Sequence, residues 1–244
     1  MKKFFALAGF CMFAIGAFAQ TNLQLFYDFG SDRKMVTATL EGFYLDKWGN
    51  TFFFSDFDFP NKTLRDANPN QHSPVASYFE IARALNFWQN SAIAPLSLHV
   101  EYNGGINLGG SCNWLFGINY DLHNADFSNT FTFELMYKTF NGGASSSFPL
   151  QFTFVWGMQD LFGLEGLRFS GFADIWGENT TNFAEGNDKD AKFIFISEPQ
   201  LWYNVGRHFG CDNLNVGTEI ELSANFAGCS GFKVRPCLGL KWVF

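Results

Sequence analysis

Hydrophobic and polar residues alternate along most of the chain from residue 20 onward. Phe131, Phe133 and Leu135, for example, lie on one face of an extended chain, whereas Thr132 and Glu134 lie on the other. Successive side chains of a β-strand point to opposite faces, so this period of two predicts strands. Divided at its turn-forming stretches, the chain gives twelve strands, at residues 22–29, 35–46, 50–59, 75–88, 95–104, 111–121, 128–140, 147–159, 165–178, 190–205, 213–226 and 231–244.

The predicted strands are long and even in number. Many span about ten residues, which is what a tilted strand needs to cross the hydrocarbon core of a bilayer. After residue 20, no uninterrupted apolar stretch reaches the roughly 18 residues of a membrane helix. Only helices and closed barrels satisfy every backbone group in lipid. We therefore predict an all-β fold, a transmembrane antiparallel β-barrel of about 12 strands, rather than a soluble sandwich, whose outer faces are polar.

The first twenty residues differ from the rest. Lys2 and Lys3 precede an uncharged apolar stretch, and residues 17–19 (AFA) form a small-x-small cleavage site. This arrangement is typical of a secretory signal peptide. We expect residues 1–19 to be a signal peptide and residues 20–244 to be a β-barrel in the outer membrane of a Gram-negative bacterium.

Connection lengths indicate which end of the barrel faces outward. The longest predicted connections, residues 60–74 and 179–189, follow odd-numbered strands, whereas the short ones at 47–49 and 160–164 follow even-numbered strands. Outer-membrane barrels combine short periplasmic turns with longer external loops. We therefore expect the two long loops to lie outside the cell, although their sequences do not indicate a role.

Arg83 is the one charged residue on the predicted outer faces. Two explanations stay open. A β-bulge nearby turns Arg83 inward, or its guanidinium extends to the membrane surface. Pro199 and Pro236 fall inside predicted strands, where each lacks the N–H that the ladder needs, so we expect local bulges or missing hydrogen bonds there.

Composition and charge exclude several classes of protein. Hydrophobic residues make up 47% of the chain and charged residues 16%, which is too apolar for a disordered protein. The formal net charge of -7 disfavours binding to nucleic acid. The sequence contains no CxxC pair and no phosphate-binding glycine loop, so we expect no cofactor and no metal.

Four short stretches resemble the Tsx-like nucleoside-specific channel-forming outer-membrane proteins. They are residues 46–58 (DKWGNTFFFSDFD), 78–81 (YFEI), 233–236 (KVRP) and 241–244 (KWVF). The chain also resembles a group of uncharacterised, distantly Tsx-like outer-membrane proteins of Bacteroides-type bacteria. The resemblance implies a twelve-stranded barrel through which nucleosides diffuse. The terminal Phe244 resembles the carboxy-terminal signature of outer-membrane barrels, which implies recognition by the barrel-insertion machinery.

Alternation places acidic and aromatic side chains on the inner face of the predicted barrel. The acids are Asp28, Glu41, Asp56, Asp58, Glu80, Glu101, Glu134, Asp174, Glu178, Glu198, Glu219 and Glu221, and the bases are Lys138, Arg168, Lys192, Lys233, Arg235 and Lys241. This excess of acids disfavours anions and tolerates neutral or cationic solutes. The residues expected beside the passage are Phe26, Asp28, Phe52, Phe54, Asp56, Asp58, Glu80, Arg168, Asp174 and Trp176.

These observations predict a non-enzymatic outer-membrane channel for passive diffusion of nucleosides or similar small neutral solutes. Its expected partners are outer-membrane lipid, the barrel-insertion machinery and a nucleoside-like solute, with no nucleic acid. A membrane-embedded lipid-modifying enzyme is one alternative, with Ser97 as nucleophile and His99 as base. Another is a structural or adhesive barrel without transport, in which the inward charges pair across a filled interior.

Overall fold

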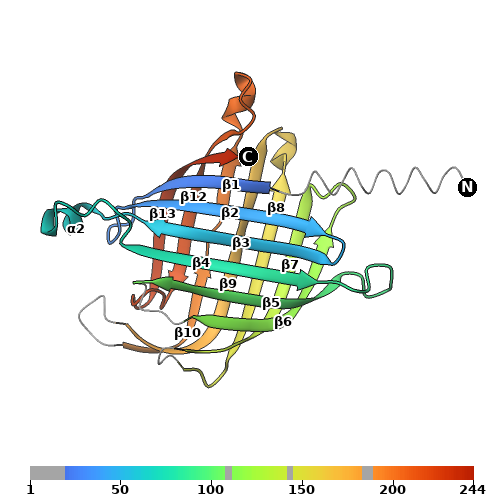
Figure 1. The fold of residues 1–244 in the computed structure, drawn as a ribbon, viewed down its shortest axis with the longest axis horizontal. Helices are drawn as coiled ribbons and strands as arrows, with labels where there is room; N and C mark the ends of the chain where they lie inside the picture. Colours follow the sequence, from blue (N-terminus) through green and yellow to red (C-terminus); the bar gives the residue numbers. More distant parts are fainter. Residues whose placement is uncertain (1–19, 108–111, 142–144, 183–188) are drawn as a thin grey trace, which may run out of the picture.

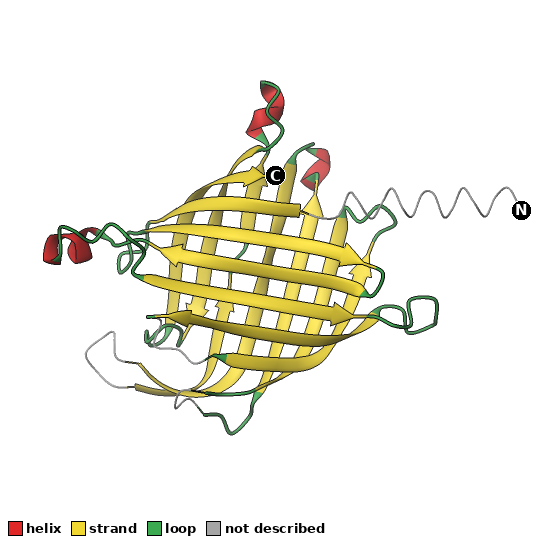
Figure 2. Ribbon diagram, viewed as in Figure 1, coloured by secondary structure: helices red, strands yellow, loops and turns green. Residues whose placement is uncertain are grey.

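The computed structural model describes residues 20–107, 112–141, 145–182 and 189–244. The predicted signal peptide, residues 1–19, lies outside the described residues. The described part folds into a closed antiparallel β-barrel of twelve strands, one of them interrupted (Figures 1 and 2). The strand segments are β1 (Gln20–Asp28), β2 (Val36–Asp46), β3 (Gly49–Asp58), β4 (Ala76–Leu85), β5 (Leu96–Ile106), β6 (Asn113–His123), β7 (Asn129–Lys138), β8 (Leu150–Gln159), β9 (Leu167–Asn182), β10 (Lys189–Ser197), β11 (Gln200–Tyr203), β12 (Leu214–Ala224) and β13 (Phe232–Val243).

The barrel closes where the first strand meets the last. β1 pairs with β13, and the N–H of Phe244 donates to the carbonyl of Thr21 (2.9 Å) just beyond that pairing. In Figure 2 the strands at the front cross those at the back, as expected for tilted strands on opposite walls of a barrel. Closure leaves the sheet without an unpaired edge, so the backbone can sit in lipid.

The predicted tenth strand, residues 190–205, is one strand of the barrel in two segments. β10 and β11 both pair with β9 on one side and with β12 on the other. Glu198 and Pro199 separate them, because the proline ring has no N–H for the ladder. At Pro236, by contrast, the register with β12 continues without a shift, so the bulge expected there is absent from this described strand.

The connections alternate between the two ends of the barrel. We call the end that carries the short helix α2 (Lys62–Ala67) the α2 end, and the end that carries both chain termini the terminal end. The terminal end also carries the 3-10 helices η1 (Leu161–Gly163) and η2 (Val205–His208), and Figure 2 shows these two together, away from α2.

Connection lengths agree only in part with the prediction. The longest connection, residues 59–75, lies at the α2 end and includes α2. The predicted loop 179–189 is wrong at its start, because β9 continues to Asn182; residues 183–188 lie outside the described residues. Two terminal-end connections, residues 86–95 and 204–213, are also longer than the short turns expected there.

The outer face of the barrel is an apolar belt. Along β13, Leu238 and Leu240 are 56% and 51% exposed, whereas the residues between and beside them are buried. Aromatic side chains are exposed on the same face: Tyr27, Tyr44, Trp114, Tyr120, Tyr137 and Trp242. Exposed apolar rows on every strand fit contact with lipid, so the barrel crosses a membrane with the predicted faces outward. Within the described ranges, no helix is both long and apolar enough to span a membrane.

Arg83 lies on the outer face, and the bulge interpretation is wrong. It pairs in uninterrupted register with Thr51 of β3 and Val100 of β5. Its guanidinium donates to Asp46 (2.8 Å) and to Thr51 (3.0 Å). Asp46 ends β2 at the terminal end, so Arg83 extends toward that rim, as an outer cation at a membrane surface does.

Candidate functional site: the barrel interior

Strand register brings the predicted inner residues of β2, β3 and β4 together. Phe54 of β3 lies between Glu41 and Glu80, its partners on the two neighbouring strands. Paired residues point to the same face, so acidic and aromatic side chains share this wall. Lys192 lies at the irregularity in the β9–β10 pairing, where it opposes two residues of β9, and its side chain is exposed.

Three aromatic rings follow one another along this wall. The centroids of Phe52 and Phe54 are 5.9 Å apart, and those of Phe54 and Tyr78 are 5.6 Å apart. All three side chains are partly exposed, although they face inward. We call Phe52, Phe54 and Tyr78 the aromatic ladder; its rings offer apolar faces to whatever occupies the interior.

Carboxylates flank the aromatic ladder in fixed positions. The hydroxyl of Thr39 donates to Asp56 (2.6 Å), and that of Thr37 donates to Asp58 (2.6 Å). The hydroxyl of Tyr78 donates to Glu80 (3.3 Å). Each threonine hydroxyl donates one hydrogen bond to its carboxylate, and a carboxylate accepts about four. The remaining acceptor sites of Asp56 and Asp58 can bind a solute.

Part of the interior is open to solvent. Phe43 and Val155 are each 37% exposed, yet both face inward, since Phe43 pairs with Phe52 and Val155 is two residues from the buried Thr153. Arg168 is also exposed, although it pairs with the buried Trp202. Water therefore reaches the inner wall beside the aromatic ladder.

The wall around β1, β11 and β13 is packed instead. Phe26 and Trp202 lie with their ring centroids 5.5 Å apart and are 5% and 1% exposed. The Lys241 ammonium sits 4.1 Å above the centre of the Trp202 ring. Gly239 lies against both rings, and a Cβ there would meet Phe26 at 2.7 Å. Phe26 thus lies in a filled part of the interior.

An ion-pair network joins the β1–β2 connection to the barrel wall at the α2 end. Arg235 of β13 donates to Glu221 of β12 (2.5 Å) and to Asp32 of the β1–β2 connection (2.7 Å). Arg33 of the same connection lies 2.7 Å from Glu221 and 3.6 Å from Asp28. Arg235, Glu221 and Asp28 are almost fully buried. The hydrogen bond from Arg235 holds the pKa of Asp32 below its usual range.

Sequence reasoning missed Asp32 and Arg33. Alternation assigns faces only within strands, and both residues lie in a connection, residues 29–35, whose side chains contact β12 and β13. Tyr78 was missed as a wall residue as well, although extending the alternation by one step from Glu80 would have found it.

Asp174 and Trp176 lie on β9, across the interior. The Trp176 indole donates to Glu178 (2.7 Å), and the Lys138 ammonium lies 3.9 Å above its ring centre. Trp176 packs with the buried Ile194 and is 8% exposed. One oxygen of Asp174, Oδ1, is buried without a hydrogen-bond partner among the described residues.

The residues of the alternative enzyme hypothesis are both buried. Ser97 is 3% and His99 is 5% exposed. The hydrogen bond that the structure gives His99 runs from its Nε2 to Glu101 (3.3 Å). A serine nucleophile needs a histidine base within hydrogen-bond reach. One of the two ring nitrogens of His99 is hydrogen-bonded to Glu101 and so is not available to Ser97.

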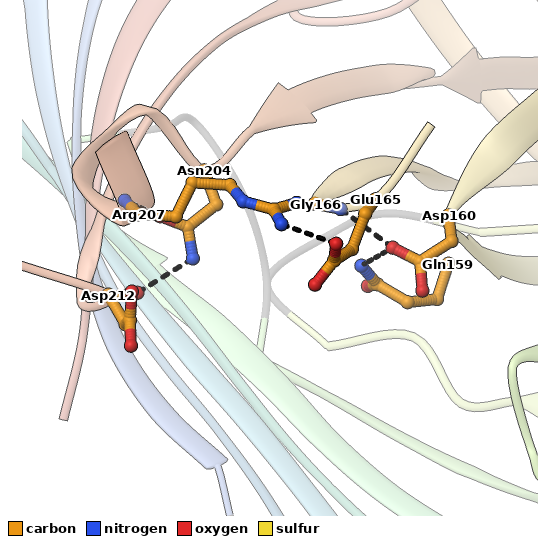
Figure 3. Close-up of a pocket in the computed structure, with 7 residues that line it drawn as sticks. All are labelled: Gln159, Asp160, Glu165, Gly166, Asn204, Arg207 and Asp212. Carbon is orange, nitrogen blue, oxygen red and sulfur yellow. Dashed lines mark hydrogen bonds and ion pairs between the residues drawn. The ribbon is translucent and has the colours of Figure 1, made fainter. Parts of the chain in front are cut away.

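A separate polar recess of about 470 Å³ opens at the terminal end, beside η1 and η2 (Figure 3). Arg207 pairs with Glu165, and Asn204 donates to the carbonyl of Asp212 (2.8 Å). The N–H of Gly166 donates to Asp160 (2.7 Å) and lowers the pKa of that carboxyl. The polar groups of the recess largely bind one another, so they hold the two connections together.

A family model matches residues 19–244, and its description is "Domain of unknown function (DUF5020)". The chain belongs to the DUF5020 family. No curated protein matches it.

Several solved structures are similar to this DUF5020 chain. One, described as "Unveiling the Mechanism Behind the in-meso Crystallization of Membrane Proteins", is 8% identical with a TM-score of 0.48, covering 92% of this chain and 83% of the other. The Acinetobacter baumannii outer membrane protein Omp33 is 10% identical with a TM-score of 0.42, at 93% and 97% coverage. The A. baumannii outer membrane channel DcaP is 13% identical with a TM-score of 0.38, at 87% and 64% coverage.

Proposed function

We propose that this DUF5020 protein is an outer-membrane channel through which small neutral or cationic solutes diffuse passively, and that nucleosides are the class its interior fits best. The observation that carries the proposal is the aromatic ladder of Phe52, Phe54 and Tyr78, flanked by carboxylates on a wall that water reaches. The apolar outer belt supports a location in the outer membrane, since barrels of this kind occur there.

A nucleoside matches both kinds of group on this wall. Its flat base stacks on aromatic rings, a contact worth about 1–3 kcal/mol per base where it has been measured. Its ribose hydroxyls donate hydrogen bonds, and Asp56 and Asp58 each keep acceptor capacity beside their threonine partners. Such contacts are weak enough to allow release, which conduction requires.

Charge sets the sign of the solute. The accessible wall carries Glu41, Asp56 and Glu80 close to the rings, with Arg168 as its exposed base. Negative walls in a low-dielectric barrel repel anions. Phosphorylated nucleosides should therefore pass more slowly than nucleosides.

The α2 end sets a condition on transport. The network of Arg235, Glu221, Asp32 and Arg33 lies at that end, and in this proposal the connection of residues 29–35 narrows the passage until it moves. This closure is also the observation that favours the second candidate, a structural barrel without transport. Because Arg33 is partly exposed and held by ion pairs rather than by packing, we infer a movable closure.

The expected partners follow from the same proposal. The outer belt contacts membrane lipid, and the last strand with Phe244 presents its end to the barrel-insertion machinery. Phe244 is 70% exposed and its N–H already joins the closing pairing at Thr21. An exposed terminal aromatic beside the seam is accessible to an assembly factor.

Flux into liposomes tests the proposal. Purified protein is reconstituted, and entry of uridine, adenosine and adenosine monophosphate is compared with that into protein-free vesicles. We expect nucleoside entry that exceeds nucleotide entry and that persists without any gradient of a driving ion. Absence of flux and of single-channel conductance, both in the wild type and in Arg33→Ala, would establish the structural barrel instead.

A further inference from the structure

Three metal-ligating side chains meet inside the barrel, on β5 and β7. One ligand atom each from His99, Glu101 and Glu134 lies within 4.8 Å of the others. Their side chains are 2%, 4% and 11% exposed. Glu101 pairs with Ala82 of β4, two residues from Glu80, so the cluster lies next to the wall that carries the aromatic ladder.

The hydrogen bond of His99 fixes which ring nitrogen is free. Nε2 lies 3.3 Å from Glu101, an acceptor, so this nitrogen carries the proton. Nδ1 is buried without a hydrogen-bond partner among the described residues, and in neutral His99 it holds the lone pair. It lies 3.8 Å from Oε1 of Glu134. A carboxylate that orients an imidazole in this way is the usual outer partner of a metal-bound histidine.

Asn119 supplies a second unpaired atom at the same place. It lies on β6, paired directly with Glu134 of β7, and it is close enough to His99 to interact with the ring. Its Oδ1 is also buried and lacks a hydrogen-bond partner in the described part of the chain. A lone pair on nitrogen, an amide oxygen and a carboxylate thus converge, and none of the three is a donor.

The charge around the cluster is negative. Glu80 and Asp174 interact electrostatically with Glu101 and Glu134. The Lys138 ammonium is committed to Gln151 (3.1 Å) and to the Trp176 ring. A bound cation would offset the repulsion among these acids when they are ionised.

We propose that His99 Nδ1, Glu134 and Asn119 Oδ1 bind a divalent transition-metal ion of the Zn²⁺ type, with Glu101 positioning the histidine. Zinc binds imidazole and carboxylate at about 2.0–2.2 Å. Two such bonds span up to about 4.2 Å, so the 3.8 Å between Nδ1 and Glu134 admits the ion. Imidazole favours Zn²⁺ over Ca²⁺ and Mg²⁺, which prefer oxygen ligands alone. The inference is independent of whether the barrel transports solutes.

Calorimetric titration of the purified full chain in detergent tests the site, after removal of bound metal with a chelator. With Zn²⁺ as the probe, we expect one equivalent to bind. His99→Gln and Glu134→Gln should each weaken binding at least tenfold, and Glu101→Gln should weaken it by about 10-fold or more through the orientation of His99. Glu219→Gln is the matched control, since Glu219 is an inner acid of β12 bound by Gln200 (2.6 Å) and should not change the affinity.

Heat-modifiable electrophoretic mobility identifies the variants that fold. Co²⁺ in place of Zn²⁺ adds a spectroscopic test, because its visible absorption bands report nitrogen and oxygen ligands. This test uses the wild-type protein alone, so it does not depend on whether the variants fold. Absence of stoichiometric Zn²⁺ binding by the folded wild type would overturn the proposal. Unchanged binding in folded His99→Gln or Glu134→Gln would overturn it as well, because the metal would then lie elsewhere.

Discussion

Arg33, in the connection between β1 and β2, lies 2.7 Å from Glu221 of β12, two strands away around the barrel wall. The contact ties the connection of residues 29–35 to β12 at the α2 end. Arg235 binds the same carboxylate from the side of β13 (2.5 Å). The buried Glu221 therefore pairs with Arg235 of the wall and with Arg33 of the connection. Only Arg33 can move away without disturbing a strand.

Replacing Arg33 should open the α2 end. In Arg33→Ala, Glu221 keeps Arg235, so the wall stays intact while the connection loses its anchor. We expect single-channel conductance in planar bilayers to rise about twofold or more, because the constriction widens. Lys34→Gln removes a neighbouring exposed charge and should leave conductance unchanged. Equal conductance in wild type and Arg33→Ala would place the closure elsewhere.

Asp32 gives the closure a defined pH dependence. Its pKa is lowered by the hydrogen bond from Arg235, so its contribution is complete above the unfolded value of about 3.9 and is lost as pH falls through the lower folded pKa. Asp32→Asn should therefore conduct more than wild type at pH 5–8. The difference should persist at about pH 4 and disappear only as the pH falls further, through the lowered folded pKa of Asp32, where the wild-type carboxyl also becomes neutral. Conductance of the two proteins recorded across this range checks the sign.

The aromatic ladder should determine affinity for nucleosides. Removing the central ring in Phe54→Ala deletes a stacking contact worth about 1–3 kcal/mol, so we expect roughly tenfold weaker block of ion current by adenosine. Phe53→Ala removes the same ring from the outer face, and adenosine block should not change. If both variants behave alike, the ladder does not contact the solute.

Arg235 should contribute more to stability than an ion-pairing arginine at the surface. Arg235 is 2% exposed and binds two carboxylates, so Arg235→Met removes one of the two cations that pair with the buried Glu221 and should cost about 3 kcal/mol. Arg207 pairs with Glu165, whose side chain is 78% exposed, and Arg207→Met should cost less than about 1 kcal/mol. Denaturant unfolding in detergent, followed by tryptophan fluorescence, measures both. Similar losses would contradict the difference in burial.

The barrel itself was predictable because one rule governs every strand. Lipid outside and a polar interior require each strand to carry apolar residues on one face and polar residues on the other. On β13 this rule correctly predicts that Leu238 and Leu240 face lipid and that Arg235 faces the interior. The same rule predicted the inner wall with Phe54 and Glu80.

Contacts made by connections were not predictable in this way. Asp32 and Arg33 lie outside any strand, and their partners Arg235 and Glu221 are about two hundred residues further along the chain. Nothing in the period of a strand encodes such a contact. The unpaired nitrogen of His99 was likewise hidden, because it depends on the orientation of one ring rather than on which face the residue occupies.

The interruption at Glu198 and Pro199 has a consequence for how the wall responds to heat. Where a proline replaces a donor, the two segments on either side are held by fewer shared hydrogen bonds than an unbroken strand of that length. Amide protons of β11, which has only four residues, should exchange with deuterium sooner than those of its eleven-residue neighbour β12. Thermal unfolding of the barrel should then begin at β11 and spread from there to the adjacent strands.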